Sequence, residues 1–123
     1  MPARVTHFEI PVDDSARAER FYSSAFGWTI QAFPGAPQYY GLATTGEDTQ
    51  PGINGALFQR GENTSTTLSV SVDSIDDAMA AVEKEGGRTV QGTMPVPNMG
   101  WFAVCEDTEG NRIGLWKDDP NAG

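Results

Sequence analysis

Hydrophobic and polar residues alternate near the start of the chain. Over residues 6–12 the apolar Phe8, Ile10 and Val12 are separated by other side chains. A period of two is typical of a strand with one buried face. Asp13, Asp14 and Ser15 follow as candidate helix N-caps. Apolar residues then recur at helical spacing over residues 18–25, and Gly27 is expected to end that helix.

Three further strands are predicted in the first half of the chain. They cover about residues 28–33, 39–44 and 53–59. Pro34-Gly35 and the polar stretch 45–52 supply the breaks between them. The first half therefore has the element order strand, helix, strand, strand, strand.

The second half repeats this order. A strand over residues 67–72 precedes Ser74 and Asp77, which resemble a capping box before a helix that ends at Gly86-Gly87. Strands are expected at about 89–94, 101–106 and 112–116. A shift of sixty residues aligns the two halves without a gap, so that the apolar positions of one first strand fall on those of the other.

This duplication predicts an α+β fold made of two βαβββ modules with pseudo-two-fold symmetry. We expect a single domain over residues 1–123, with modules at about 4–60 and 64–118. A chain of 123 residues is long enough to fold without disulfide staples. Its one cysteine, Cys105, forms no intrachain disulfide and is interpreted as a small buried hydrophobe.

Charge and composition narrow the functional classes. The formal net charge of -9 argues against a nucleic-acid partner, because phosphate binding needs a basic face. The same charge permits a cationic small-molecule ligand, although solubility is its simpler explanation. No apolar run reaches the length of a membrane span and no signal peptide is recognised, so we expect a cytoplasmic protein without a membrane partner.

Several motifs occur in an order that resembles a known superfamily. They are His-Phe-Glu-Ile-Pro-Val-Asp-Asp from residue 7, Phe26-Gly27-Trp28, Gly100-Trp101-Phe102, and Glu-Asp-Thr-Glu-Gly-Asn-Arg-Ile from residue 106. The ordered set resembles the glyoxalase/bleomycin resistance/dioxygenase superfamily, also called vicinal oxygen chelate (VOC). The resemblance implies a curved mixed sheet around a small-molecule cavity, helices on the outside, and a homodimer. It does not specify a function, because this fold hosts metal enzymes, metal-free enzymes and binding proteins.

Strand alternation assigns side chains to the expected cavity. His7 and Glu9 share one strand face and are the candidate acid/base pair. The candidate ligand-binding residues are Asn54, Phe58, Thr67, Ser69, Arg112, Trp116 and Trp101. The third strand of each module stays ambiguous: either Tyr39 or Tyr40, and either Trp101 or Phe102, faces the cavity.

The resemblance also implies where a metal would bind, with one ligand on each of four strands. His7 matches the first position, but Thr67, Gly114 and Asn54 or Ala56 stand at the others. A catalytic zinc site normally needs three protein ligands. We therefore expect no metal cofactor in this chain, with His7 as the only ligand if a divalent metal does bind.

Three functions remain open from the sequence. The first is a protein that sequesters a small-molecule ligand, with a cationic ligand as one option. The second is a metal-independent enzyme that uses His7 and Glu9. The third is a metal-dependent lyase or dioxygenase of the glyoxalase type, with its site completed across a dimer. His7 could equally be a hydrogen-bonded remnant, and Glu9 could pair with Arg112 instead of a ligand.

Overall fold

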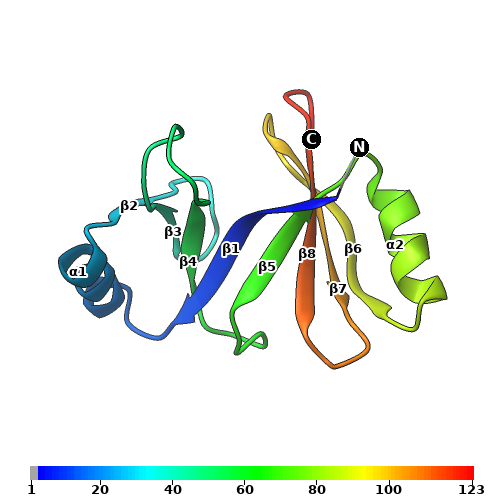
Figure 1. Ribbon diagram of the computed structural model, residues 1–123, viewed down its shortest axis with the longest axis horizontal. Helices are drawn as coiled ribbons and strands as arrows, with labels where there is room; N and C mark the ends of the chain where they lie inside the picture. Colours follow the sequence, from blue (N-terminus) through cyan, green and yellow to red (C-terminus); the bar gives the residue numbers. More distant parts are fainter. Residues whose placement is uncertain (1–2) are drawn as a thin grey trace. The chain divides into compact units, whose positions relative to one another are not determined.

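The element order strand, helix, strand, strand, strand occurs twice in the computed structural model, which describes residues 3–123 (Figure 1). The first set is β1 (Arg4–Val12), α1 (Ser15–Phe26), β2 (Thr29–Ala32), β3 (Tyr40–Thr44) and β4 (Gly55–Gln59). The second set is β5 (Thr67–Ser71), α2 (Ile75–Lys84), β6 (Arg88–Val96), β7 (Gly100–Glu106) and β8 (Arg112–Asp118). The predicted α+β class with two βαβββ modules is confirmed.

The chain divides into two compact units. One is His7–Thr66, and the other is Thr67–Gly123 together with the start of the chain up to Thr6. The module bounds of 4–60 and 64–118, the single domain and the cavity stay predictions.

Both helices begin at the caps that the sequence offers. The side chain of Asp14 accepts a hydrogen bond from the Arg17 amide at 3.0 Å, and Ser74 does the same for the Asp77 amide at 3.1 Å. These bonds satisfy amides that have no partner within a helix. Gly27 ends α1 with a φ of 75°, a left-handed conformation that favours glycine.

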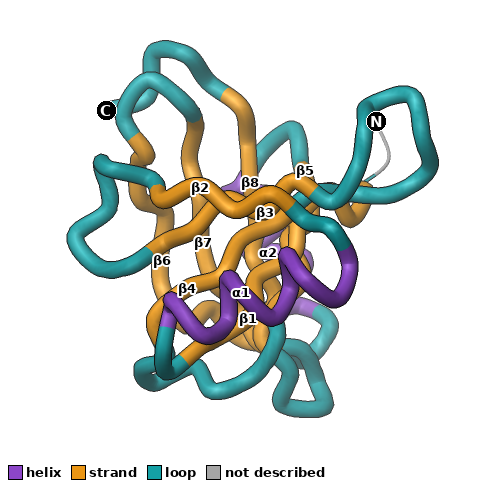
Figure 2. The backbone as a smooth tube through the Cα atoms, turned by 90° about the vertical axis from the view of Figure 1, so that its left-hand side faces the viewer, coloured by secondary structure: helices purple, strands orange, loops and turns teal. Residues whose placement is uncertain are grey.

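The His7–Thr66 unit is a four-stranded mixed sheet with α1 against it. The strand order is β2-β3-β4-β1, with β1 and β4 parallel and the other pairs antiparallel. Phe8 and Ile10 on β1 pair with Gly55 and Leu57 on β4, so these residues share one face. Figure 2 shows α1 lying across this sheet.

Aromatic rings attach α1 to its sheet. Tyr22 stacks on Trp28 with ring centroids 4.9 Å apart, and Trp28 contacts Phe8 on β1 at 5.6 Å. Leu57 is completely buried beneath this layer. The face of β1 that carries Phe8 and Ile10 is therefore the helix-facing side, as its alternation predicts.

The unit containing residues 67–123 has the strand order β5-β8-β7-β6, and Figure 1 shows α2 running beside β6. Its core is the cluster of Ile75, Ala103, Cys105 and Leu115. Burial raises the pKa of the Cys105 thiol, which is consistent with a small packed hydrophobe. Within residues 3–123 no helix has the length and apolar character of a membrane span.

Several strand boundaries differ from the prediction by one or two residues, and three of these differences have a clear structural reason. β4 begins at Gly55, two residues later than expected, because Asn54 belongs to the preceding loop. β6 extends to Val96 despite Pro95, which an outermost strand accommodates because one of its sides needs no ladder hydrogen bond. β8 continues to Asp118, since its pairing with β7 persists to Gly100.

Candidate functional site

Three side chains from two strands meet on the face of the His7–Thr66 sheet that lies away from α1. His7 and Glu9 alternate with Phe8 and Ile10 along β1, so they point away from the helix. The third side chain is Tyr40, the first residue of β3. We call His7, Glu9 and Tyr40 the β1–β3 triad.

Hydrogen bonds connect the β1–β3 triad. The Tyr40 hydroxyl donates to Glu9 Oε2 at 2.5 Å and lies 3.0 Å from His7 Nε2. His7 Nε2 and Glu9 Oε2 are 3.7 Å apart. The side chains of His7 and Glu9 keep 31% and 30% of their surface exposed, so a ligand can reach both.

The electrostatics of the β1–β3 triad keep Glu9 ionised. Burial raises the pKa of Glu9, but contacts with His7 and the Tyr40 hydroxyl outweigh burial and leave this pKa below its usual value. The pKa of Tyr40 is strongly raised by burial and by the neighbouring Glu9 charge. Tyr40 is thus a neutral hydrogen-bond donor beside a carboxylate, which is the charge pattern of a site for a cation or a hydrogen-bond donor.

Apolar groups surround the β1–β3 triad. Phe58 on β4 pairs with both Tyr40 and Pro11, which places it on the same face. The Phe33 ring lies edge-on to Tyr40 with centroids 6.5 Å apart, and Leu42 is 38% exposed. A few polar groups among apolar side chains are typical of small-molecule sites. His7, Glu9 and Phe58 are thus brought together, as the strand alternation predicts.

Asn54 takes a different position from the one predicted. It lies outside β4, and its side-chain oxygen accepts a hydrogen bond from the Thr45 amide at 2.9 Å. The Thr45 hydroxyl in turn donates to the Ile53 carbonyl at 2.6 Å. Asn54 therefore closes the loop before β4 in this structure, and a role in ligand binding stays a prediction.

Four of the remaining predicted residues share a face in the other unit. Ser69 pairs with Gly114, and Ser71 pairs with Trp116, so β5 and β8 present their alternate residues on the same side. The residues on this side include Thr67, Ser69, Arg112 and Trp116. Thr67 and Ser69 are buried, with 4% and 8% of their surface exposed. Ligand contacts for these residues stay predictions.

Trp101 does not join that face, which corrects its grouping with Trp116. Phe102 pairs with Trp116, so its neighbour Trp101 points to the opposite side of β7. There it packs against the core cluster that α2 covers, and its indole N–H donates to Asp119 at 2.9 Å. The sequence left this choice open, because both residues are large aromatics.

The sequence also left open which of two adjacent tyrosines belongs to the site. Tyr40 joins His7 and Glu9, whereas the Tyr39 hydroxyl donates to Glu19 on α1 at 2.7 Å. The signal that would have decided this is the pair of small residues Gly41 and Ala43, because a close-packed helix face demands small side chains. A β-carbon on Gly41 would collide with the Tyr39 side chain.

The donor set of the β1–β3 triad does not fit a divalent metal. His7 and Glu9 supply two donors, whereas catalytic zinc normally has three protein ligands. Over residues 3–123, no group of three or more His, Cys, Asp and Glu side chains is placed to hold a metal ion. Any additional ligands would have to come from outside these residues.

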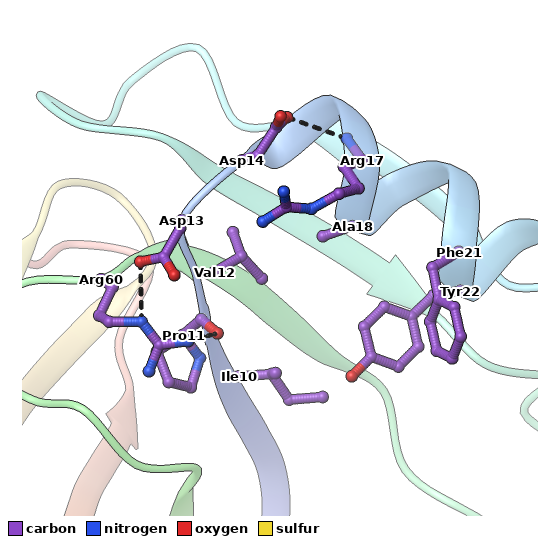
Figure 3. Close-up of a pocket in the computed structure, with 10 residues that line it drawn as sticks. All are labelled: Ile10, Pro11, Val12, Asp13, Asp14, Arg17, Ala18, Phe21, Tyr22 and Arg60. Carbon is purple, nitrogen blue, oxygen red and sulfur yellow. Dashed lines mark hydrogen bonds and ion pairs between the residues drawn. The ribbon is translucent and has the colours of Figure 1, made fainter.

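A pocket of about 320 Å³ lies between the end of β1 and α1, and no member of the β1–β3 triad lines it (Figure 3). Phe21 and Tyr22 of α1 line it together with Ile10 of β1. Asp14, which also lines it, is engaged as the cap of α1. We interpret this pocket as a seam between β1 and α1.

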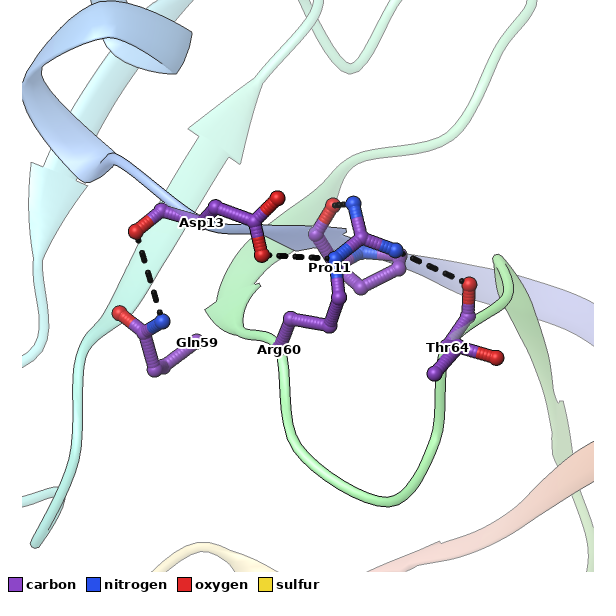
Figure 4. Close-up of polar contacts among 5 residues, drawn as sticks. All are labelled: Pro11, Asp13, Gln59, Arg60 and Thr64. Atoms are coloured by element: carbon purple, nitrogen blue, oxygen red, sulfur yellow. Dashed lines mark hydrogen bonds and ion pairs between the residues drawn. The ribbon is translucent and has the colours of Figure 1, made fainter.

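Arg60 occupies one wall of that pocket and ties together the segments around it (Figure 4). Its Nε donates to Asp13 Oδ1 at 2.9 Å, and its Nη1 donates to the Thr64 carbonyl at 3.1 Å. A longer contact of 3.4 Å joins Nη2 to the Pro11 carbonyl. Arg60 therefore holds the end of β1 against the loop that follows β4.

Comparisons with known proteins agree on the fold. Residues 4–44 match the family described as bleomycin resistance protein-like N-terminal. A glyoxylase-like domain-containing protein of Didymella fabae is 27% identical over 118 residues, which cover 91% of each chain. A putative glyoxylase of Mycobacterium bovis is 25% identical over 121 residues, covering 94% of this chain but only 46% of that protein. The chain thus spans less than half the length of this second relative.

Solved structures show the same architecture. A glyoxalase/bleomycin resistance protein/dioxygenase superfamily member from Vibrio splendidus has a TM-score of 0.69 at 13% identity, covering 95% of this chain and 100% of its own. Methylmalonyl-CoA epimerase from Mycobacterium tuberculosis has a TM-score of 0.68 at 16% identity, covering 94% and 88%. At these identities the likeness establishes the fold alone.

Proposed function

We propose that this chain, which belongs to the glyoxalase/bleomycin resistance/dioxygenase superfamily, binds a small molecule at the β1–β3 triad without a divalent metal. The observation that carries the proposal is the hydrogen-bonded set of His7, Glu9 and Tyr40, partly exposed and bordered by apolar side chains. Methylmalonyl-CoA epimerase, a structural neighbour, has been solved in complex with methylmalonyl-CoA. Small-molecule binding therefore occurs on this fold.

Each member of the triad has a chemical role in the proposal. The Tyr40 hydrogen bond favours the ionised form of the Glu9 carboxyl group. The negative charge of Glu9 therefore attracts a cationic or hydrogen-bond-donating group of the ligand. The His7 imidazole carries nitrogen atoms that can accept or donate a hydrogen bond, which would make it the acid/base group if the ligand is turned over. Phe58 offers its ring to the apolar part of the ligand.

A ligand screen tests this function. Wild type and His7→Ala would be compared by thermal shift against a panel that includes bleomycin, methylmalonyl-CoA and simple ammonium ions. A ligand at a hundred times its dissociation constant adds about 2.7 kcal/mol to the free energy of unfolding. We expect stabilisation of wild type that the variant loses. Stabilisation that is equal in both proteins would place the binding site elsewhere.

The screen also separates sequestration from catalysis. A ligand recovered unchanged after prolonged incubation indicates sequestration, and this is the outcome we propose. Conversion of the ligand by wild type and not by His7→Ala would instead indicate a metal-independent enzyme. A fall in the product yield of the Glu9→Gln variant would then assign the carboxylate to the same reaction.

The second candidate function is a metal-dependent lyase or dioxygenase of the glyoxalase type. The observation that favours it is the pair of nitrogen and oxygen donors, His7 Nε2 and Glu9 Oε2, only 3.7 Å apart. Such donors suit Ni, Zn, Fe or Mn. This function requires further ligands from a second copy of the chain, so it predicts that metal content and activity both depend on dimerisation.

A further inference from the structure

The Tyr40 hydroxyl has one proton to donate, and its hydrogen-bond distances indicate which neighbour accepts it. A tyrosine hydroxyl donates a single hydrogen bond and can accept through its remaining lone pairs. Within residues 3–123 the Tyr40 hydroxyl contacts Glu9 Oε2 and His7 Nε2, and the contact with Glu9 is the shorter, at 2.5 Å against 3.0 Å. An ionised carboxylate has no proton to donate, so Tyr40 must be the donor in the contact with Glu9.

The contact with His7 then has a fixed direction. Because the Tyr40 proton is used for Glu9, its oxygen can only accept from His7. His7 Nε2 must therefore carry a hydrogen. In a neutral imidazole one nitrogen is protonated and the other is an acceptor, so a proton on Nε2 leaves the Nδ1 lone pair free. Among residues 3–123, His7 forms its side-chain contacts through Nε2 and none through Nδ1.

We propose that Tyr40 is a positioning residue that relays the charge of Glu9 to His7 and holds the imidazole with its proton on Nε2, so that Nδ1 is presented as the acceptor. This inference deepens the proposed function, because it specifies that the ligand contacts His7 through a hydrogen-bond donor. The triad then carries one net negative charge when His7 is neutral. A ligand with an ammonium, hydroxyl or amide N–H group suits that arrangement, whereas a carboxylate is repelled.

The adjacent tyrosine provides a matched control. Tyr39 differs from Tyr40 by one position, yet its hydroxyl bonds to Glu19 on α1 and not to the triad. Tyr39→Phe and Tyr40→Phe remove the same atom from two adjacent residues at the start of β3. Only the second change removes the partner of His7.

Nitrogen-15 NMR of the full chain reads the tautomer directly. The chain contains a single histidine, so its imidazole signals need no assignment by mutation. At a pH where His7 is neutral, we expect wild type and Tyr39→Phe to show one form, with a slowly exchanging proton bonded to Nε2. We expect Tyr40→Phe to lose that protected proton and to show the two tautomers in rapid exchange.

A second variant keeps the test decisive if Tyr40→Phe does not fold. Glu9→Ala removes the acceptor, which frees the Tyr40 proton for His7 Nε2. We expect this variant to move the imidazole proton toward Nδ1. A proton on Nδ1 in wild type, or spectra of Tyr40→Phe and Glu9→Ala that match wild type, would overturn the assignment. Retention of the Nε2 proton with no binding in the ligand screen would refute the proposed function and leave the role of Tyr40 intact.

Discussion

Tyr39 and Tyr40 are neighbours in the sequence, but their hydroxyls bond to carboxylates on opposite sides of one sheet. Tyr39 donates to Glu19 on α1, and Tyr40 donates to Glu9 on β1. Successive residues of an extended chain point to opposite faces, so one tyrosine serves the helix contact and the other the site. The two roles can therefore be separated by single substitutions.

Replacing Tyr39 with Phe should weaken the attachment of α1. The variant loses one half-buried hydrogen bond to a carboxylate, so the free energy of unfolding should fall by about 1 kcal/mol. Urea denaturation measures this change. An unchanged unfolding midpoint would mean that the Tyr39–Glu19 bond contributes nothing beyond what water supplies.

Leu57 should be the more sensitive of two leucines on adjacent strands. It is completely buried under α1, whereas Leu42 on β3 is 38% exposed. Leu57→Ala removes packed methyl groups and leaves a cavity, which should cost about 2–5 kcal/mol. Leu42→Ala makes the same chemical change and should cost under about 1 kcal/mol. Equal losses in denaturation experiments would contradict the difference in burial between the two leucines.

Much of this fold could be predicted from the sequence because its signals are local. The caps Asp14 and Ser74 and the stop at Gly27 are each specified by the side chain or conformational freedom of one residue. The face of β1 on which His7 and Glu9 lie follows from the apolar residues that alternate with them along the strand. These features depend on short-range periodicity, which a single sequence displays.

The remaining features depend on partners far along the chain. Tyr39 and Tyr40, like Trp101 and Phe102, are adjacent aromatics for which alternation gives no preference, and only strand pairing decides between them. Asn54 continues the strand pattern of residues 53–59, but its side chain accepts a hydrogen bond from the Thr45 amide in the preceding loop. The sequence alone indicates His7 and Glu9 but does not add Tyr40 to them, because the Tyr40 hydroxyl bonds to residues that lie 31 and 33 positions away in the chain.

Arg60 should stabilise the end of β1 through its shape as well as its charge. Arg60→Ala removes the ion pair with Asp13 and two carbonyl contacts, but these groups are largely exposed. The free energy of unfolding should fall by about 1 kcal/mol. Arg60→Lys keeps the charge but cannot span all three acceptors, so it should recover less than half of the loss. Full recovery by lysine in urea denaturation would show that charge alone matters.

Asp107 should give the turn before β8 an acid-sensitive stability. Backbone and side-chain hydrogen bonds from Asn111 and the amide of Glu109 hold its pKa below the ordinary 3.8. A carboxyl group whose pKa is lower in the folded than in the unfolded chain stabilises the fold at any pH above the unfolded-state pKa. This contribution is lost as the pH falls through the folded-state pKa. Asp107→Ala should therefore be less stable than wild type at pH 7.

The comparison must be repeated in acid. The difference in unfolding midpoint between wild type and Asp107→Ala should narrow steadily as the pH falls below 3.8, because the protonated carboxyl loses its advantage. Glu109→Ala serves as a control, since only the amide of Glu109 bonds to Asp107. A difference that does not change with pH would assign the effect to turn conformation instead of to the carboxylate.

Metal content tests the central claim most directly, because the β1–β3 triad supplies only two candidate ligands. Tag-free wild type and His7→Ala would be equilibrated with Ni, Zn, Fe or Mn, desalted, and measured by elemental analysis. We predict far less than one metal ion per chain in both proteins. Near-stoichiometric metal in wild type that disappears in His7→Ala would contradict metal-free binding and would point to a site completed by a second chain.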